Sequence, residues 1–217
     1  MKIKILSVCC ILLAAICVLQ AFLLVRTNKN DISSATRIQD VNASATDIQF
    51  KLALMHIYYE SNTVLSTLPF TTIQISESAL IKAYVSSGSE AITAALKYVD
   101  DYADRTLDSA FETMDDILEK YDKVLKKYNI SSSSSYTSKY NKLKTIFSSV
   151  KNSSNELLSR TRSLIRNINS SDYDTYYTKY VEQLSDLSSK LEEYCTTVMD
   201  EYDTLMQAIS DEYNIIK

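Results

Sequence analysis

The alternation of apolar and polar residues divides the chain into one apolar N-terminal segment and several long amphipathic segments. Residues 5–25 are apolar apart from Ser7 and Gln20. A helix of this length spans about 31 Å, close to the thickness of the hydrocarbon core of a bilayer. Lys2 and Lys4 precede the segment, and positive charge at this place favours a cytoplasmic N-terminus.

The sequence therefore predicts a cytoplasmic tail at residues 1–4, an uncleaved signal anchor at residues 5–25 and an extracytoplasmic region at residues 27–217. A cleaved signal peptide remains the alternative, although the apolar region of such a peptide has only about 7–15 residues. Arg26 and Lys29 follow the segment and weigh against this orientation. We expect a single-pass membrane protein whose C-terminal domain lies outside the cytoplasm.

Beyond residue 30, apolar residues recur at alternating steps of three and four, which is the period of an amphipathic helix. The repeat predicts helices over about 31–67, 71–86 plus 90–128, 136–168 and 172–216. The stripe of the first helix comprises Ile38, Val41, Ala45, Ile48, Leu52, Met55 and Tyr59. The stripe of the last comprises Tyr173, Tyr177, Tyr180, Leu184, Leu187, Leu191, Tyr194 and Val198.

Turn signals separate these segments. Pro69 is the only proline, and because the residue before a proline avoids helical dihedral angles, the first helix is expected to end just before it. Gly88, the only glycine, marks a second break and provides Ser89 as a cap for the next helix. One glycine costs a helix only about 1 kcal/mol, so whether 71–128 forms one helix or two stays open. A polar turn at 129–135 completes the pattern.

Similar lengths and short connections favour antiparallel neighbours. The predicted fold class is thus all-α, with an N-terminal transmembrane helix followed by an antiparallel up-down-up-down four-helix bundle of coiled-coil type. Residues 130–169 carry seven basic side chains and one acidic side chain, whereas residues 71–129 and 170–217 carry eleven acidic side chains each. The third helix should therefore lie between the second and the fourth. The expected ion pairs are Asp104–Arg160, Glu112–Lys151, Arg160–Glu182 and Lys139–Asp203.

Composition excludes most catalytic sites. The P-loop, the nucleophile elbow and the dinucleotide-binding loop each need at least two glycines, and the chain has one. His56 is the only histidine, and three of the four cysteines lie in the apolar segment, too few ligands for a zinc site. The formal net charge is −4, which does not favour nucleic acid as a partner. We expect no enzyme activity, no cofactor and no bound metal.

Three sets of residues remain as candidate sites. Arg160, Arg162 and Arg166 form the densest basic cluster and a candidate anion site, since guanidinium groups bind carboxylate or phosphate well. Cys195 either forms a disulfide between chains or is a half-buried thiol. Tyrosines of the last helix either line a narrow core or contact another chain. The candidate interface comprises Tyr173, Tyr177, Tyr180, Tyr194 and Tyr202.

The sequence thus predicts a membrane-anchored, non-enzymatic helical bundle that acts by protein–protein interaction, as a scaffold, tether or assembly partner, with self-association included. The alternative is a sensor or solute-binding ectodomain. In architecture the chain is similar to chemoreceptor ectodomains, which are membrane-tethered four-helix bundles that bind small anions through arginines between helices. That alternative would require a membrane partner to relay the signal, because a tail of four residues cannot carry a signalling domain.

Overall fold

The computed structural model describes the backbone of residues 32–85 and 88–216 and the side chains of residues 45–85 and 88–212. All regular structure in these residues is helical, so the expected all-α class is confirmed. The predicted signal anchor lies outside the described residues. None of the helices searched within them is long and apolar enough to cross a bilayer. Residues 47–217 form one compact unit, and the packing below is that of this unit.

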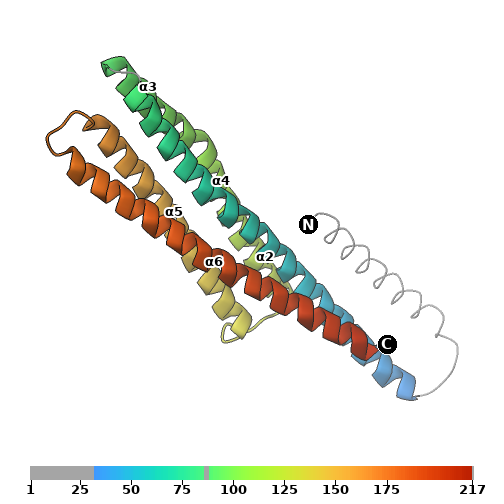
Figure 1. Ribbon diagram of the computed structural model, residues 1–217. Helices are drawn as coiled ribbons and strands as arrows, with labels where there is room; N and C mark the ends of the chain where they lie inside the picture. The colour runs from blue at the N-terminus through green and yellow to red at the C-terminus, as the bar shows by residue number, and fades with distance from the viewer. Residues whose placement is uncertain (1–31, 86–87, 217) are drawn as a thin grey trace. The chain divides into compact units, whose positions relative to one another are not determined.

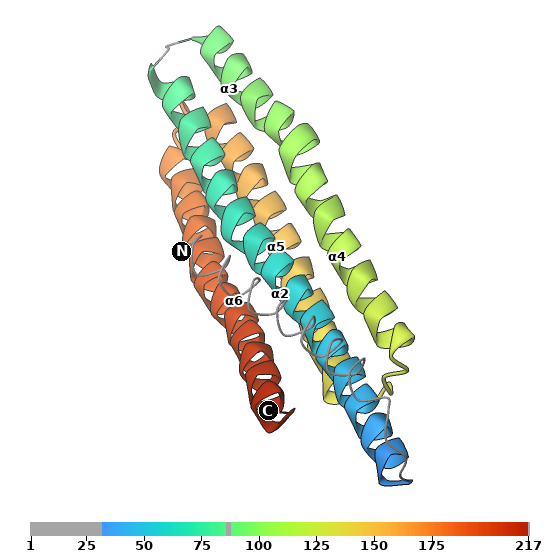
Figure 2. The ribbon, with the colours of Figure 1, turned by 90° about the vertical axis from the view of Figure 1, so that its right-hand side faces the viewer.

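The described residues form four helical segments (Figure 1), the second of which contains a π-helical turn. Their bounds are α2 Ile32–Val85, α3 Ser89–Tyr102, η1 Ala103–Leu107, α4 Asp108–Lys127, α5 Ser135–Arg166 and α6 Tyr173–Ile216. Within the compact unit, successive segments run in alternating directions (Figure 2). The predicted bounds of the last two helices agree with α5 and α6 within two residues.

The expected break before Pro69 is wrong, because α2 continues through this residue to Val85. Buried side chains lie on both sides of the proline: Leu65 is fully buried before it, and Thr72 and Ala79 are fully buried after it. A proline inside a helix costs about 3 kcal/mol. Each large apolar side chain that the continued helix buries returns about 1.5–3 kcal/mol, so packing outweighs the local cost.

The second half of α2 is weakly marked in the sequence because its buried stripe contains hydroxyl residues. Ser61, Thr72 and Ser76 are fully buried. Each donates its hydroxyl hydrogen to the carbonyl oxygen four residues earlier, at 2.7–2.9 Å. Such a bond satisfies the donor locally and lets a polar residue occupy a core position. Residues 71–85 therefore belong to the first helix and not to the second.

The apolar stripe predicted for the first helix is also wrong where the structure describes its side chains. Ala45, Ile48 and Leu52 are only half-buried, and Tyr59 is 46% exposed. Met55 is also half-buried, although it packs against the core. The rest of the predicted stripe, at Ile38 and Val41, lies outside the described side chains. The residues that α2 buries in this region are Phe50, Leu54, Ile57 and Tyr58. This part of α2 is thus apolar on two faces, and the apolar period alone does not show which of them faces the core.

The chain reverses direction between Val85 and Ser89, at the glycine and not at the proline. Gly88 has φ 128° and ψ 172°, dihedral angles that only glycine adopts readily. The expectation that Ser89 caps the next helix is wrong, because Ser89 is its first residue and Gly88 occupies the capping position without a side-chain bond. The open question about 71–128 is thereby answered: it contains the end of one helix and the whole of the next segment.

The π-helical turn at Ala103–Leu107 keeps two apolar stripes facing the same core. Val99 and Tyr102 are buried three residues apart, but the next buried residue, Leu107, follows after five. A step of five would rotate a side chain away from the stripe of an α-helix, whereas it fits one turn of π-helix. From Leu107 the α-helical repeat resumes with Met114.

The turn predicted at 129–135 is confirmed. Asn129 adopts φ 53°, and the N–H of Ile130 donates to the carbonyl oxygen of Leu125 at 2.9 Å, as in a Schellman motif. Asparagine replaces the usual glycine here because its side chain tolerates this conformation. The hydroxyl of Ser134 then caps α5 by accepting from the N–H of Thr137 at 3.2 Å.

Charge orders the helices as predicted, since α5 packs against α3, α4 and α6. The register differs from the expected ion pairs by about one helical turn or less. Arg160 pairs with Glu156 of its own helix at 2.6 Å instead of bridging to a neighbour. The observed pairs between α5 and its neighbours are Asp115–Lys151 at 2.7 Å, Asp100–Arg162 at 2.8 Å and Lys139–Glu201.

Replacing Gly88 with alanine is expected to lower the free energy of unfolding by about 1–3 kcal/mol. No side chain lies within 4 Å of an added Cβ atom, so the loss would come from the backbone conformation alone. Urea unfolding followed by circular dichroism measures the change. Ser89→Ala, one residue further along, is the matched control and should change stability by less than about 0.5 kcal/mol. Equal stability of the two variants would contradict the proposed role of Gly88.

Candidate interaction surfaces

The three arginines of the candidate anion site lie along the last turns of α5. Arg162 donates from Nε to an oxygen of Asp100 at 2.8 Å, and Arg160 pairs with Glu156 at 2.6 Å. Arg166 is exposed in the last turn. Carboxylates therefore already neutralise two of the three guanidinium groups, which reduces the attraction of this cluster for a further anion.

Cys195 lies on α6 as a half-buried free thiol that packs against the core. Burial raises the pKa of this thiol, which keeps it protonated and less reactive at neutral pH. Of the two interpretations left open by the sequence, this environment favours the half-buried thiol.

The five candidate tyrosines of α6 divide into an internal and an external set. Tyr180 is buried, and Tyr194 is partly buried and donates its hydroxyl to Ser149 on α5 at 2.8 Å. Tyr202 packs against the core. Tyr177 is 48% exposed, although the sequence placed it on the buried stripe. The apolar repeat could not make this distinction because tyrosine suits both environments.

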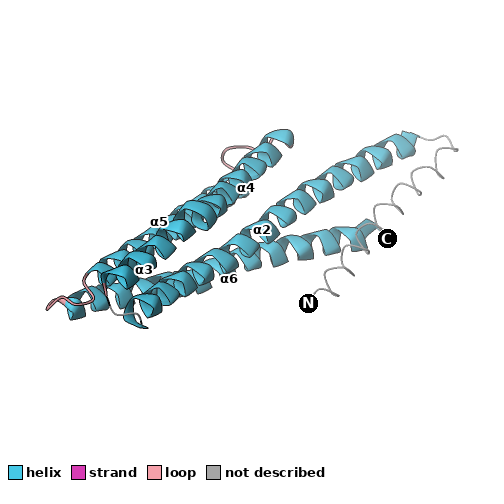
Figure 3. Ribbon diagram, turned by 90° about the horizontal axis from the view of Figure 1, so that it is seen from above, coloured by secondary structure: helices cyan, strands magenta, loops and turns pink. Residues whose placement is uncertain are grey.

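An exposed apolar patch covers the end of α2 and the beginning of α6. Both segments lie at the same end of the compact unit (Figures 2 and 3). The ring of Tyr84 meets that of Tyr173 edge-on at 6.1 Å, with their hydroxyls hydrogen-bonded, and Tyr173 stacks on Tyr177 at 5.9 Å. Ile81 is 61% and Val85 is 80% exposed. We call this surface the tip patch; it comprises Ile81, Tyr84, Val85, Tyr173, Tyr177 and Val181.

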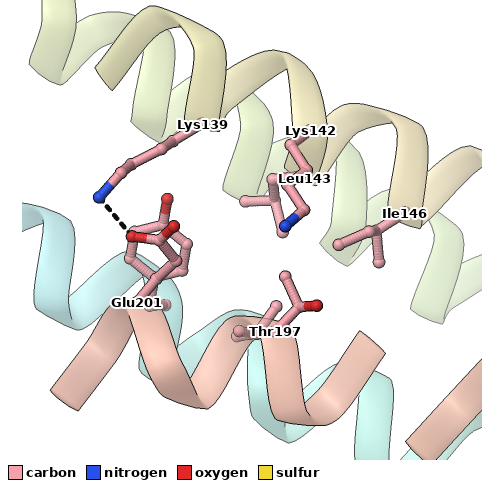
Figure 4. Close-up of a pocket in the computed structure, with 8 residues that line it drawn as sticks. Lys139, Lys142, Leu143, Ile146, Thr197 and Glu201 are labelled. Carbon is pink, nitrogen blue, oxygen red and sulfur yellow. Dashed lines mark ion pairs between the residues drawn. The ribbon is translucent and has the colours of Figure 1, made fainter. Parts of the chain in front are cut away.

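A small pocket lies where α5 and α6 meet near Tyr58 of α2 (Figure 4). Its free volume of about 10 Å³ is close to the space of one water molecule. Lys139 reaches across its edge to form an ion pair with Glu201. Ligand sites for small organic molecules are usually about 300–1,000 Å³, so this pocket does not have the size of one. The lining residues are Tyr58, Lys139, Lys142, Leu143, Ile146, Thr197, Val198 and Glu201.

Buried tyrosines beside this pocket join α2 to α4. The hydroxyl oxygens of Tyr58 and Tyr121 lie 3.2 Å apart, and both side chains are buried. Burial and the neighbouring Tyr121 hydroxyl raise the pKa of Tyr58 far above its usual value of 10.0. Burial also raises the pKa of Tyr121 to about 12 and that of Tyr180 to about 12. These groups serve as neutral hydrogen-bonding and packing groups, not as acids or bases at physiological pH.

At the other end of the unit, a charged cluster ties α6 to α2. Lys51 forms ion pairs with Asp47, at 2.6 Å, and with Glu212 near the end of α6. Burial alone would lower the pKa of Lys51. Hydrogen bonds to the two carboxylates act against burial and raise the pKa above its usual value. The cluster thus holds α6 against α2 far from the tip patch.

No protein-family model, curated protein sequence or solved structure matches this chain. In the part of the chain that the structure describes, no group of three or more histidine, cysteine or acidic side chains is placed to hold a metal ion.

Alkaline pH is expected to destabilise the fold above about pH 10. Unfolded tyrosine ionises near pH 10, whereas Tyr58, Tyr121 and Tyr180 keep their protons to about pH 12 or beyond. The folded state then binds more protons, so the free energy of unfolding falls by about 1 kcal/mol per pH unit for each group. Urea unfolding at pH 9 to 11.5, with tyrosinate absorbance as a second signal, measures the slope.

Tyr180→Phe should reduce this slope, because it removes one of the groups whose pKa is higher in the folded state. The Tyr180 hydroxyl has no hydrogen-bond partner among the described residues, so its removal should not lower stability at pH 7. Val181→Ala, one residue further along the same helix and exposed, is the matched control; it removes no titratable group and should leave the slope unchanged. A slope that is unaffected by Tyr180→Phe would contradict the assignment.

Proposed function

We propose that this chain is a membrane-anchored, non-enzymatic interaction protein that acts outside the cytoplasm as a scaffold, tether or assembly partner. In this proposal residues 5–25 form the transmembrane signal anchor, and residues 27–217 form an antiparallel four-helix bundle that presents a binding surface. The apolar length of the first segment and its preceding lysines support the anchor.

The observation that carries the proposal is the tip patch. Contiguous exposed apolar surface is uncommon on soluble domains and marks sites that bind other proteins. Aromatic residues are enriched at the centres of such sites because their rings bury a large area at a small entropic cost. Tyr84 and Tyr177, each about half exposed, provide two such rings from two helices.

The position of the patch also suits a tether. From Asp47 to Val85, α2 is a continuous helix whose length is about 58 Å. The tip patch lies at the C-terminal end of this helix, the end that is farther along the chain from the proposed anchor.

The sensor alternative has less support from the described residues. Arg160 and Arg162, which would bind an anion, are already paired with carboxylates. The pocket beside Tyr58 has room for about one water molecule, not for a solute.

A photoreactive amino acid at Tyr177 of the full chain is expected to yield a discrete covalent adduct with another protein in native membranes. Adding Tyr84→Lys should reduce the adduct by about tenfold, since a buried unpaired ammonium group opposes an apolar contact. The matched control is Met206→Lys, on an exposed apolar residue of α6 outside the patch. The same membranes, washed at alkaline pH, report whether the chain is retained as an integral protein.

Loss of the chain from washed membranes would overturn the anchor. An adduct that forms equally with Tyr84→Lys and Met206→Lys would overturn the tip patch as the binding surface. Binding of a small anion that raises the melting temperature, and whose effect is lost in Arg162→Ala, would favour the sensor instead.

A further inference from the structure

The apolar stripe that does not face the core of the bundle forms a second, outward seam along α2. Successive residues of a helix differ by about 100° in direction, so residues that follow this stripe point away from the buried Leu54, Ser61 and Leu68. In Figure 2, α2 runs across the front of α5 between α6 and α4, which leaves one side of α2 facing outward. We call this side the outer seam; its members are Ile48, Leu52, Met55, Tyr59, Thr63, Ser66 and Phe70. Met55 lies at the edge of the seam, where it also packs against the core.

The outer seam has bulky rings at two positions and small side chains between them. Tyr59 is 46% and Phe70 is 57% exposed. Thr63 donates its hydroxyl to the carbonyl of Tyr59 at 3.0 Å, and Ser66 donates to the carbonyl of Thr63 at 3.1 Å. Thr67, beside the seam, also donates to Thr63 at 2.7 Å. Because these donors are satisfied within the helix, covering them with another apolar surface leaves none of them unpaired.

Charge is absent from the middle of this helix. Between Glu60 and Glu77 no residue is ionisable, although 23% of the whole chain is charged. Glu60 itself forms an ion pair with Lys120 of α4 at 2.8 Å, and Nε2 of His56 lies 3.2 Å from its carboxylate. A second chain could therefore approach the outer seam without burying an unpaired charge.

The spacing of the seam indicates which partner covers it. A helix that is apolar on both sides is buried on both sides, and the bundle covers only one side of α2. The residues of the outer seam follow one another at steps of three and four, and in the sequence this repeat extends back to Ile38. Such a repeat is that of a coiled coil, in which the partner is another helix with the same repeat. Among the described helices, the outward faces of α4, α5 and α6 carry many charged residues. They include Asp108, Glu112, Lys142, Lys144, Glu182 and Glu192.

We propose that the occupant of the outer seam is a second copy of this chain, with α2 packed in parallel against α2 of the other copy. The parallel orientation rests on the proposed function, because two copies anchored in one membrane point the same way. An uncharged seam lets two acidic chains meet without repulsion at the contact.

The area of the seam sets the strength of the pairing. From Ile48 to Phe70 it is about 35 Å long and about 10 Å wide, so two copies bury about 700 Å² in all. Stable complexes bury about 1,200–2,000 Å², so the pair dissociates in dilute solution. Confinement to a membrane raises the effective concentration of one copy near another and favours the pair.

Disulfide trapping in membranes tests this pairing with the full chain. In a background in which Cys9, Cys10, Cys17 and Cys195 are serine, Ser66→Cys should form a disulfide-linked dimer after mild oxidation. Ser189→Cys, at an exposed serine of α6, is the matched control and should not. Adding Tyr59→Glu with Phe70→Glu should reduce the Ser66→Cys dimer about tenfold, since carboxylates would be buried unpaired. Adding Met199→Glu with Met206→Glu, two exposed apolar residues of α6, should not.

The proposal is overturned if Ser66→Cys forms no more dimer than Ser189→Cys, or if the dimer persists with glutamate at positions 59 and 70. Circular dichroism of the detergent-solubilised variants shows whether they remain folded, and the comparison of the two cysteine positions does not depend on the glutamate variants. Alkaline washing of the same membranes separates the two proposals. A chain that stays in the membrane without the dimer contradicts the pairing alone, whereas a chain that is washed off contradicts the anchor.

Discussion

The arrangement of the described helices depends on α2 being one continuous helix through Pro69. Side chains buried on both sides of the proline, Leu65 before it and Thr72 after it, make continuation more favourable than a break. Continuity moves the first reversal of the chain to Gly88. The next segment, Ser89–Lys127, can then run back along the second half of α2, where the Thr72 hydroxyl meets that of Tyr102 at 3.0 Å. A helix that ended at Pro69 would instead separate Thr72 from the buried Leu65, with which it shares one face of α2.

Hydroxyl groups occupy several positions in the core that this helix organises. Tyr58 meets Tyr121, and Ser61 and Ser76 bond to their own helix. The contact between Tyr58 and Tyr121 favours one register of α2 against α4, because the two hydroxyls meet only there. The bonds of Ser61 and Ser76 form within α2 and so satisfy these hydroxyls in any register. In α6, by contrast, the buried hydroxyl of Tyr180 has no hydrogen-bond partner among the described residues.

The sequence pattern predicted α5, α6, the turn at 129–135 and the place of the basic helix, because each has one apolar face or a one-sided charge. It failed on α2 for two physical reasons. First, the core of α2 includes Ser61 and Thr72, which are polar residue types. The hydrogen bonds within the helix that allow them to be buried are not indicated by the sequence. Second, the outward side of α2, with Ile48 and Leu52, appears as regular as a core. Among the candidate sites, spacing could identify a tyrosine seam but could not separate buried Tyr180 from exposed Tyr177.

A helix with two apolar faces connects the two proposals made for this chain. The bundle packs against one face of α2. A second copy on the outer seam would pack against the opposite face and so fix how the two bundles are oriented. The Lys51 cluster ties the end of α6 to α2 near one end, and the contact of Tyr84 with Tyr173 ties the beginning of α6 to α2 near the other. Pairing through α2 would therefore set the spacing between two tip patches. A partner with two matching sites would then bind more tightly than one with a single site, because its second contact forms within the same complex.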